Sequence, residues 1–170
     1  MCKKIAGVVF VILILLSVIA CGEKKEAEPI KAEPVKVASV KAVPLQVFEQ
    51  EISSPAPPQT HNVNENITIP VTVKNVSNVP WPCKTASDEK STNRVTLGYQ
   101  WLDSTGKAIK DGRVMLSDDL FPGSSITLEA KVQAPSEPAD YALRFSMVQE
   151  NVAWFHNKGA VPLIINIKVQ

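Results

Sequence analysis

Histidine and cysteine, which dominate catalytic and metal sites, are scarce in this sequence. Its 170 residues include two histidines and three cysteines. A zinc site needs three or four ligands at suitable spacing, and His61, His156 and Cys83 lie far apart in the chain. No nucleophile elbow, phosphate loop or dinucleotide-binding fingerprint occurs either. We therefore expect no metal site, no cofactor, no catalytic residues and no enzymatic activity.

A concentration of charge of one sign is also missing. Eighteen Lys and Arg residues stand against seventeen Asp and Glu residues, which gives a formal net charge of +1. The basic residues are scattered singly, so no basic stripe is available to neutralise several phosphates, and nucleic acid is not an expected partner. The adjacent carboxylates Asp118–Asp119 and Asp88–Glu89 lack the spaced ligands of a calcium loop. We interpret them as solvated turn residues.

Only one long hydrophobic run is present, and it begins the chain. Lys3 and Lys4 precede a largely apolar run of about sixteen residues from Ile5 to Ala20, whereas a helix needs about 20 residues to cross a bilayer. A short basic region, then apolar residues, then small residues is the layout of a secretory signal peptide. We predict that residues 1–20 are such a signal; the alternative is an uncleaved single-span anchor.

The end of this run resembles the lipobox of bacterial lipoproteins. Val18-Ile19-Ala20-Cys21 places aliphatic and small residues before a cysteine. The resemblance implies cleavage before Cys21, diacylglycerol on its sulfur and an acyl chain on the new amino terminus. Several acyl chains hold a protein firmly at a membrane, whereas one holds it only marginally. It also implies a place in the bacterial cell envelope. In that family an Asp directly after the cysteine tends to retain the protein in the inner membrane. Here Gly22 stands at that place, so in a two-membrane bacterium the resemblance favours the outer membrane, on its periplasmic or surface side, over the inner membrane.

Residues 21–44 have the composition of a tether. AEPIK at 27–31 is followed directly by AEPVK at 32–36. The prolines disfavour helix, and the small apolar residues cannot build a core. We predict an extended, disordered segment that holds the remainder, residues 45–170, clear of the lipid surface.

Cys83 is the one cysteine that neither signal cleavage nor lipidation would account for. Cys2 leaves with the signal and Cys21 carries lipid, so Cys83 has no partner for an intrachain disulfide. We interpret it as a small loop residue, with a disulfide to a second molecule as the alternative.

Hydrophobic and polar residues alternate in segment after segment of residues 45–170, which is typical of half-buried strands. Strands are expected at 67–73, 95–101, 126–132, 141–147 and 161–169, with less regular ones near 45–52 and 113–116. Seven short strands with turn-rich joints predict an all-β fold, an antiparallel β-sandwich. Pro70 cannot donate to a ladder, so its strand should have an edge or a bulge there.

Two features of this region resemble immunoglobulin and fibronectin type III domains. Trp101 lies in the third expected strand, where such folds often bury a tryptophan, and Pro138-Ala139-Asp140-Tyr141 resembles a tyrosine corner. More narrowly, VTVKNVSNVPWP, VTLGYQWLDSTGK and the stretch from Phe121 to Gly159 look like an Ig-like accessory domain of bacterial envelope proteins and sugar-modifying enzymes. The resemblance implies a binding or spacer role and brings no catalytic residues.

Aromatic residues make up 6% of the chain, and several fall in loops that an Ig-like strand order gathers at one end: 77–92, 117–124 and 149–159. The candidate binding surface there consists of Trp81, Phe121, Glu150, Trp154, Phe155 and His156. Flat aromatic rings beside amides and carboxylates suit a protein hot spot or a sugar ring. One alternative is that Trp81 and Trp154 turn inward and cap the core. Another is a membrane-facing patch, because the tether would leave near this end.

Taken together, these features predict a membrane-anchored envelope lipoprotein that acts as a non-catalytic protein-binding or assembly module. A glycan-binding module of the cell envelope is the alternative.

Overall fold

The computed structural model describes residues 44–55, 59–83 and 93–170. By its contacts the chain divides into two units, Met1–Lys36 and Val37–Gln170, and all described residues belong to the second. The expected signal peptide, Cys21 and the tether up to residue 43 lie outside the described residues, as does the carboxylate pair Asp88–Glu89. In the ranges above, no helix is long and apolar enough to cross a membrane.

The described chain is built from β-strands, as the alternating pattern predicted. Seven strands have four or more residues: β1 (Gln50–Ser53), β3 (Asn66–Asn75), β4 (Val95–Leu102), β5 (Ala108–Met115), β6 (Ser125–Gln133), β7 (Ala139–Gln149) and β9 (Leu163–Val169). Two short strands, β2 (Thr60–His61) and β8 (Ala153–Trp154), and one 3-10 turn, η1 (Phe155–Lys158), complete the order.

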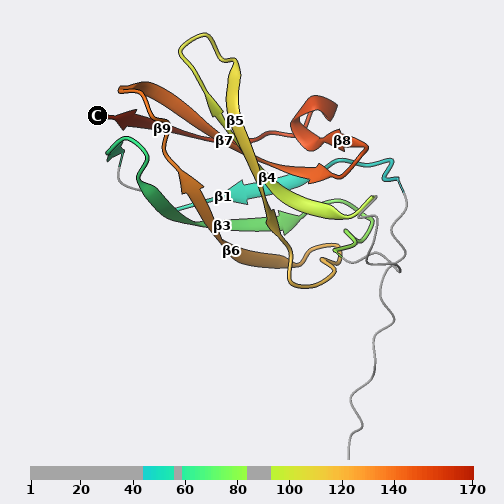
Figure 1. The fold of residues 1–170 in the computed structure, drawn as a ribbon. Helices are drawn as coiled ribbons and strands as arrows, with labels where there is room; N and C mark the ends of the chain where they lie inside the picture. Colours follow the sequence, from blue (N-terminus) through green and yellow to red (C-terminus); the bar gives the residue numbers. More distant parts are fainter. Residues whose placement is uncertain (1–43, 56–58, 84–92) are drawn as a thin grey trace, which may run out of the picture. The chain divides into compact units, whose positions relative to one another are not determined.

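The strands form two sheets that face each other (Figure 1). One sheet has the order β1-β3-β6, and the other has the order β2-β9-β7-β4-β5 with β8 beside β7. In the lettering used for immunoglobulin domains, β1, β3 and β6 correspond to strands A, B and E. The opposite sheet provides C′, C, F and G as β5, β4, β7 and β9. The predicted β-sandwich of Ig-like strand order is therefore confirmed.

One pairing departs from the predicted antiparallel arrangement. β2 runs parallel to β9, with Thr60 opposite Lys168 and His61 opposite Val169. β1 and β2 are consecutive in the chain but belong to different sheets, so the chain crosses from one sheet to the other between them. It reaches the second sheet running in the same direction as β9.

The core lies between the two sheets and is filled by alternate residues. In β3 every second residue from Ile67 to Asn75 is buried. Trp101 is fully buried, and its ring packs edge-to-face on Tyr141 at a centroid distance of 6.0 Å. The Tyr141 hydroxyl donates to the carbonyl oxygen of Glu137 at 3.1 Å. The buried tryptophan and the tyrosine corner are thus both confirmed.

Pro70 occupies a position where β3 has one strand neighbour. The pairing of β1 with β3 ends at Ser53 opposite Thr72, whereas Pro70 pairs only with Glu129 of β6. The Pro70 carbonyl accepts a hydrogen bond from Ser54 Oγ at 2.6 Å. The predicted local edge is therefore present, and the missing N–H leaves no gap in the ladder.

Candidate functional site

The loops expected to meet at one end of the sandwich do meet there. The backbone N–H of Trp81 donates to the carbonyl of Leu120 at 2.9 Å, and the rings of Trp81 and Phe155 lie 5.4 Å apart. The backbone N–H of Leu45 donates to Gln149 Oε1 at 2.8 Å. The described chain therefore starts at this same end, as the Ig-like strand order predicted.

Two residues of the predicted binding surface belong to the core instead. Trp81 and Phe155 are both 0% exposed, and Phe155 packs edge-to-face on Phe48 as well as on Trp81. These rings fill the space between the sheets at the end of the sandwich, where burying a large apolar ring is favourable. Assigning them to an exposed surface was wrong, and for Trp81 the alternative, inward packing, was right.

Trp154 has neither of the two predicted placements. β8 pairs with the end of β7, with Trp154 opposite Val148, and the indole lies on the outer face of the larger sheet. A Cβ atom at Gly98 of β4 would come within 2.5 Å of Trp154 Cζ3, so only glycine leaves room for the ring. The guanidinium carbon of Arg113, on β5, lies 4.4 Å from the ring centroid. The half-buried Trp154 ring thus lies between the surface of β4 at Gly98 and the guanidinium of Arg113.

Glu150 fixes this arginine. Its Oε1 accepts hydrogen bonds from Thr96 Oγ1 at 2.7 Å and from Arg113 Nε at 3.2 Å. Arg113 also forms an ion pair with Asp111 at 3.4 Å. The predicted surface residues Glu150 and Trp154 are therefore joined, but through Arg113, which the sequence did not single out.

His156 and Arg144 extend this arrangement along the sheet. The rings of His156 and Trp154 lie 5.3 Å apart, and the backbone N–H of His156 donates to Ser146 Oγ at 3.2 Å. Burial, and then the nearby charge of Arg144, lower the pKa of His156 below 6.5, so the imidazole is mainly neutral at pH 7. Arg144 Nε and Nη2 both donate to Gln100 Oε1, at 3.1 and 2.6 Å.

Ile164 lies beside Arg144 in the next strand and is 54% exposed. The surface built by these side chains is called the outer-face cluster below; it comprises Gln100, Arg113, Arg144, Trp154, His156 and Ile164. Phe121 is exposed in the 117–124 turn, and no contact in the described chain joins it to this cluster.

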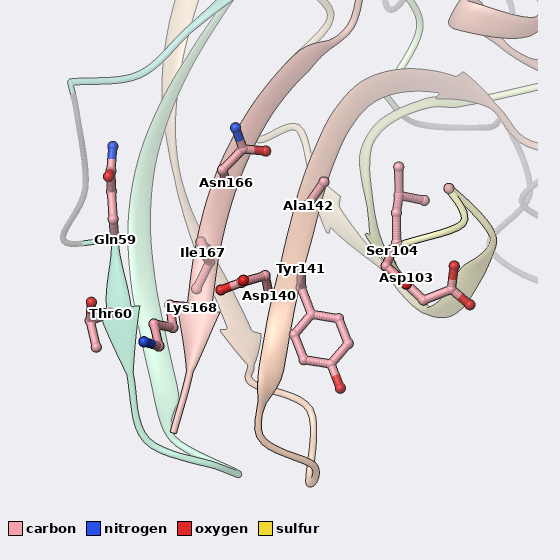
Figure 2. Close-up of a pocket in the computed structure, with 12 residues that line it drawn as sticks. Gln59, Thr60, Asp103, Ser104, Asp140, Tyr141, Ala142, Asn166, Ile167 and Lys168 are labelled. Atoms are coloured by element: carbon pink, nitrogen blue, oxygen red, sulfur yellow. The ribbon is translucent and has the colours of Figure 1, made fainter.

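A groove of about 610 Å³ lies farther along the same sheet. Figure 2 shows its lining residues coming from β2, β9, β7 and the turn after β4. Polar groups are provided by Gln59, Thr60, Asp140, Asn166 and Lys168, and the lining also includes the short side chain of Ala142. The sequence did not predict this groove, because it depends on the parallel β2–β9 pairing.

Asp103 lines the groove, but its carboxylate is hydrogen-bonded within the turn in which it lies. Its Oδ1 accepts hydrogen bonds from the N–H and hydroxyl of Thr105 and from the N–H of Lys107. These bonds lower the pKa of Asp103. Its carboxylate is therefore a turn-forming group.

Cys83 is 4% exposed, and its N–H donates to Asp119 Oδ1 at 2.8 Å. This burial agrees with a packed loop residue and gives the sulfur little access to a second molecule. In the part of the chain that the structure describes, no group of three or more His, Cys, Asp or Glu side chains is placed to hold a metal ion.

No protein-family model and no curated protein matches this sequence. Among solved structures, similar ones include the CARDB domain of PF1109 from Pyrococcus furiosus, with 17% identity, a TM-score of 0.42, and coverage of 71% of this chain and 92% of that domain. The alkylpurine DNA glycosylase AlkC of Pseudomonas fluorescens shows 13% identity, a TM-score of 0.44, and coverage of 72% and 30%. A beta-glucosidase of Listeria innocua shows 13% identity, a TM-score of 0.41, and coverage of 71% and 16%. Likenesses at this level say nothing about what the chain binds.

Proposed function

We propose that this chain is a lipid-anchored protein of the bacterial envelope whose sandwich domain is a non-catalytic module that binds another protein. In this proposal Cys21 carries the lipid and residues 21–44 are the tether. The outer-face cluster makes the contact. Because the anchor confines the domain near the membrane, even a weak contact gains from a high effective concentration.

The composition of the outer-face cluster is the observation that carries this proposal. It combines a tryptophan, two arginines and an exposed isoleucine, and Trp and Arg are enriched among residues that dominate binding energy. Arg144 is paired with the neutral amide of Gln100, and the residue opposite it in β9 is Ile164, which is 54% exposed. A partner that presents a carboxylate next to an apolar side chain would satisfy both groups.

Glycan binding is less well supported by the same geometry. A sugar stacks on an open aromatic face, but Arg113 lies over the ring of Trp154 and the ring edge rests on Gly98. In the groove the aromatic lining residue is Tyr141, whose ring packs on Trp101. The polar walls of the groove favour a hydroxyl-rich ligand, so glycan binding there is the second candidate.

The anchor is tested by Cys21→Ala in the full chain. We expect the unaltered chain to be processed, to incorporate fatty acid and to fractionate with membranes, and we expect the variant to do none of these. A variant that is processed and labelled like the unaltered chain would remove the lipid anchor from the proposal.

The contact is tested by cross-linking and affinity capture from intact envelopes. Ile164→Asp places a charge in the outer-face cluster, and Lys131→Asp is its control at an exposed position of β6 in the opposite sheet. We expect a specific protein to be captured by the unaltered chain and the control but not by Ile164→Asp. Equal capture by all three would place the contact elsewhere. Capture of no protein, with retention on purified envelope glycans, would favour the second candidate.

A further inference from the structure

The groove and the outer-face cluster share the outer face of the larger sheet and follow each other along β7. In that strand Leu143 and Phe145 are fully buried, so the alternating residues Asp140, Ala142 and Arg144 lie on the outer face. Asp140 and Ala142 line the groove, and Arg144 belongs to the cluster. Ala142 and Arg144 are two residues apart, which is about 7 Å along a strand. The groove and the cluster can therefore contact one ligand.

Three pairs of residues cross the outer face in this region. Each pair joins β7 to a neighbouring strand, and in order along β7 the pairs are Lys168–Asp140, Leu102–Ala142 and Gln100–Arg144. Successive pairs are separated by about 7 Å along the strand. Alternate side chains of an extended peptide have the same spacing. A peptide that lies along β7 can thus direct one side chain to each pair.

Each pair suits a different kind of side chain. Lys168 and Asp140 carry opposite charges, and in the part of the chain that the structure describes neither forms an ion pair, so a polar or charged group at this pair would gain hydrogen bonds. Leu102 and Ala142 give the groove apolar lining, on which an aliphatic side chain would be covered. Arg144 is bonded to a neutral amide, so a carboxylate would add a charge-assisted hydrogen bond.

The sides of the groove offer hydrogen-bonding groups to a peptide backbone. Figure 2 shows the turn 103–106 on one side and Gln59 with Thr60 on the other. A side-chain amide such as that of Gln59 both donates and accepts hydrogen bonds, as a peptide group does. A sugar would use the same polar groups, but it gains most from an open aromatic face, and the ring of Tyr141 is packed on Trp101. The lining therefore favours an extended peptide over a sugar.

We propose that the protein partner contributes an extended peptide segment that lies along β7, with a carboxylate at Arg144 and an aliphatic side chain two residues away at Ala142. The next alternate residue of the segment is polar or charged and lies at the Lys168–Asp140 pair. This inference rests on the proposed function, protein binding, and adds the kind of segment that is bound.

Photo-reactive amino acids test the path of the segment. They are placed singly at Ile164 and at Asn166, which are both exposed on the outer face of β9, in the full-length chain in intact envelopes. We expect both positions to cross-link the same protein, at residues that mass spectrometry places about two positions apart in its sequence. Links to distant segments of that protein, or a link from Ile164 alone, would overturn the extended segment and leave protein binding in place. Absence of any protein link from both positions would overturn the proposed function as well.

Filling the groove tests whether the segment occupies it. Ala142→Phe places a ring in the groove, and Lys131→Phe, at an exposed position of the opposite sheet, is the matched control. We expect capture of the partner from envelopes to fall about tenfold with Ala142→Phe and to be unchanged in the control. Asn166→Trp adds bulk to the same groove from an exposed position and should also reduce capture, which guards against a loss of folding in Ala142→Phe.

The outcomes of this experiment separate the two proposals. Capture that is lost with Ile164→Asp but unchanged by both groove variants would overturn the extended segment while protein binding at the outer-face cluster stands. Retention of purified envelope glycans without capture of any protein, with that retention lost in Ala142→Phe, would show that the groove binds a glycan and would overturn both.

Discussion

Replacing Gly98 by alanine should displace Trp154 from the outer face of the sheet. The new methyl carbon would lie 2.5 Å from Cζ3 and 2.6 Å from Cη2 of the indole, and 2.7 Å from Val148 Cγ2. The indole is a rigid ring, so it must swing away as a whole and lose its contact with Arg113. Val148 can relieve its own contact by a small rotation.

The size of the effect follows from two destabilising contributions and one stabilising contribution. Forcing a methyl group into a packed site destabilises by roughly 1–3 kcal/mol, and the lost arginine–indole contact adds about 0.5–1 kcal/mol. Replacing glycine within a strand recovers about 0.5–1 kcal/mol. We therefore expect Gly98→Ala to lower the free energy of unfolding by about 2 kcal/mol, measured by urea denaturation. The tryptophan fluorescence should shift to the red as the Trp154 indole is displaced. This shift can be assigned to Trp154 because Trp81 and Trp101 are fully buried and give a constant background.

A double-mutant cycle makes this prediction specific. In a Trp154→Ala background the ring is absent, so Gly98→Ala should be neutral or slightly stabilising, with a coupling of about 2 kcal/mol between the two sites. If Gly98→Ala were equally destabilising with and without Trp154, the indole would not occupy the space above Gly98. The placement of the outer-face cluster would then be wrong.

Three further predictions concern other parts of the domain. Burial and Arg144 hold the pKa of His156 below its ordinary value of 6.5, so the unfolded chain binds a proton at this residue more readily than the folded chain does. The free energy of unfolding should therefore fall as the pH drops from 6.5 through the lower folded-state pKa. Denaturation measured at a series of pH values should show that His156→Gln removes this dependence. An unchanged pH dependence in His156→Gln would contradict this assignment. Tyr141→Phe, which removes the hydrogen bond to Glu137, should destabilise the domain by about 1 kcal/mol in the same assay, and no loss would show that the tyrosine corner contributes nothing. Cys83, at 4% exposure, should react with a maleimide slowly in the native state and rapidly in denaturant, whereas fast native labelling would contradict its burial.

The strands were predictable from the sequence where one face is buried and the other is exposed. β3 alternates along its whole length, and the expected range 67–73 lies within it. β5 was predicted only from residue 113, because its first four residues are exposed on both faces and leave no alternation to detect. The parallel β2–β9 pair was not predictable, since a two-residue strand carries no periodicity.

The candidate site was predictable only in part. Strand order brought the loops with Trp81, Glu150 and Phe155 to one end, but which rings fill the core depends on the space between the sheets. Gly98 was the available signal for Trp154, because glycine inside a strand often marks a close approach. Arg113 and Arg144 were not predictable, since their roles depend on neighbours in adjacent strands.

The most direct test of the account is a photo-reactive amino acid at Ile164 of the full-length chain in intact envelopes, with the same group at Lys131 as the control. We expect a discrete cross-linked protein from position 164, absent from position 131 and lost when Arg144→Glu is introduced. Cross-linking to the same proteins from both positions, or persistence of the product with Arg144→Glu, would contradict the claim that the outer-face cluster is the binding surface.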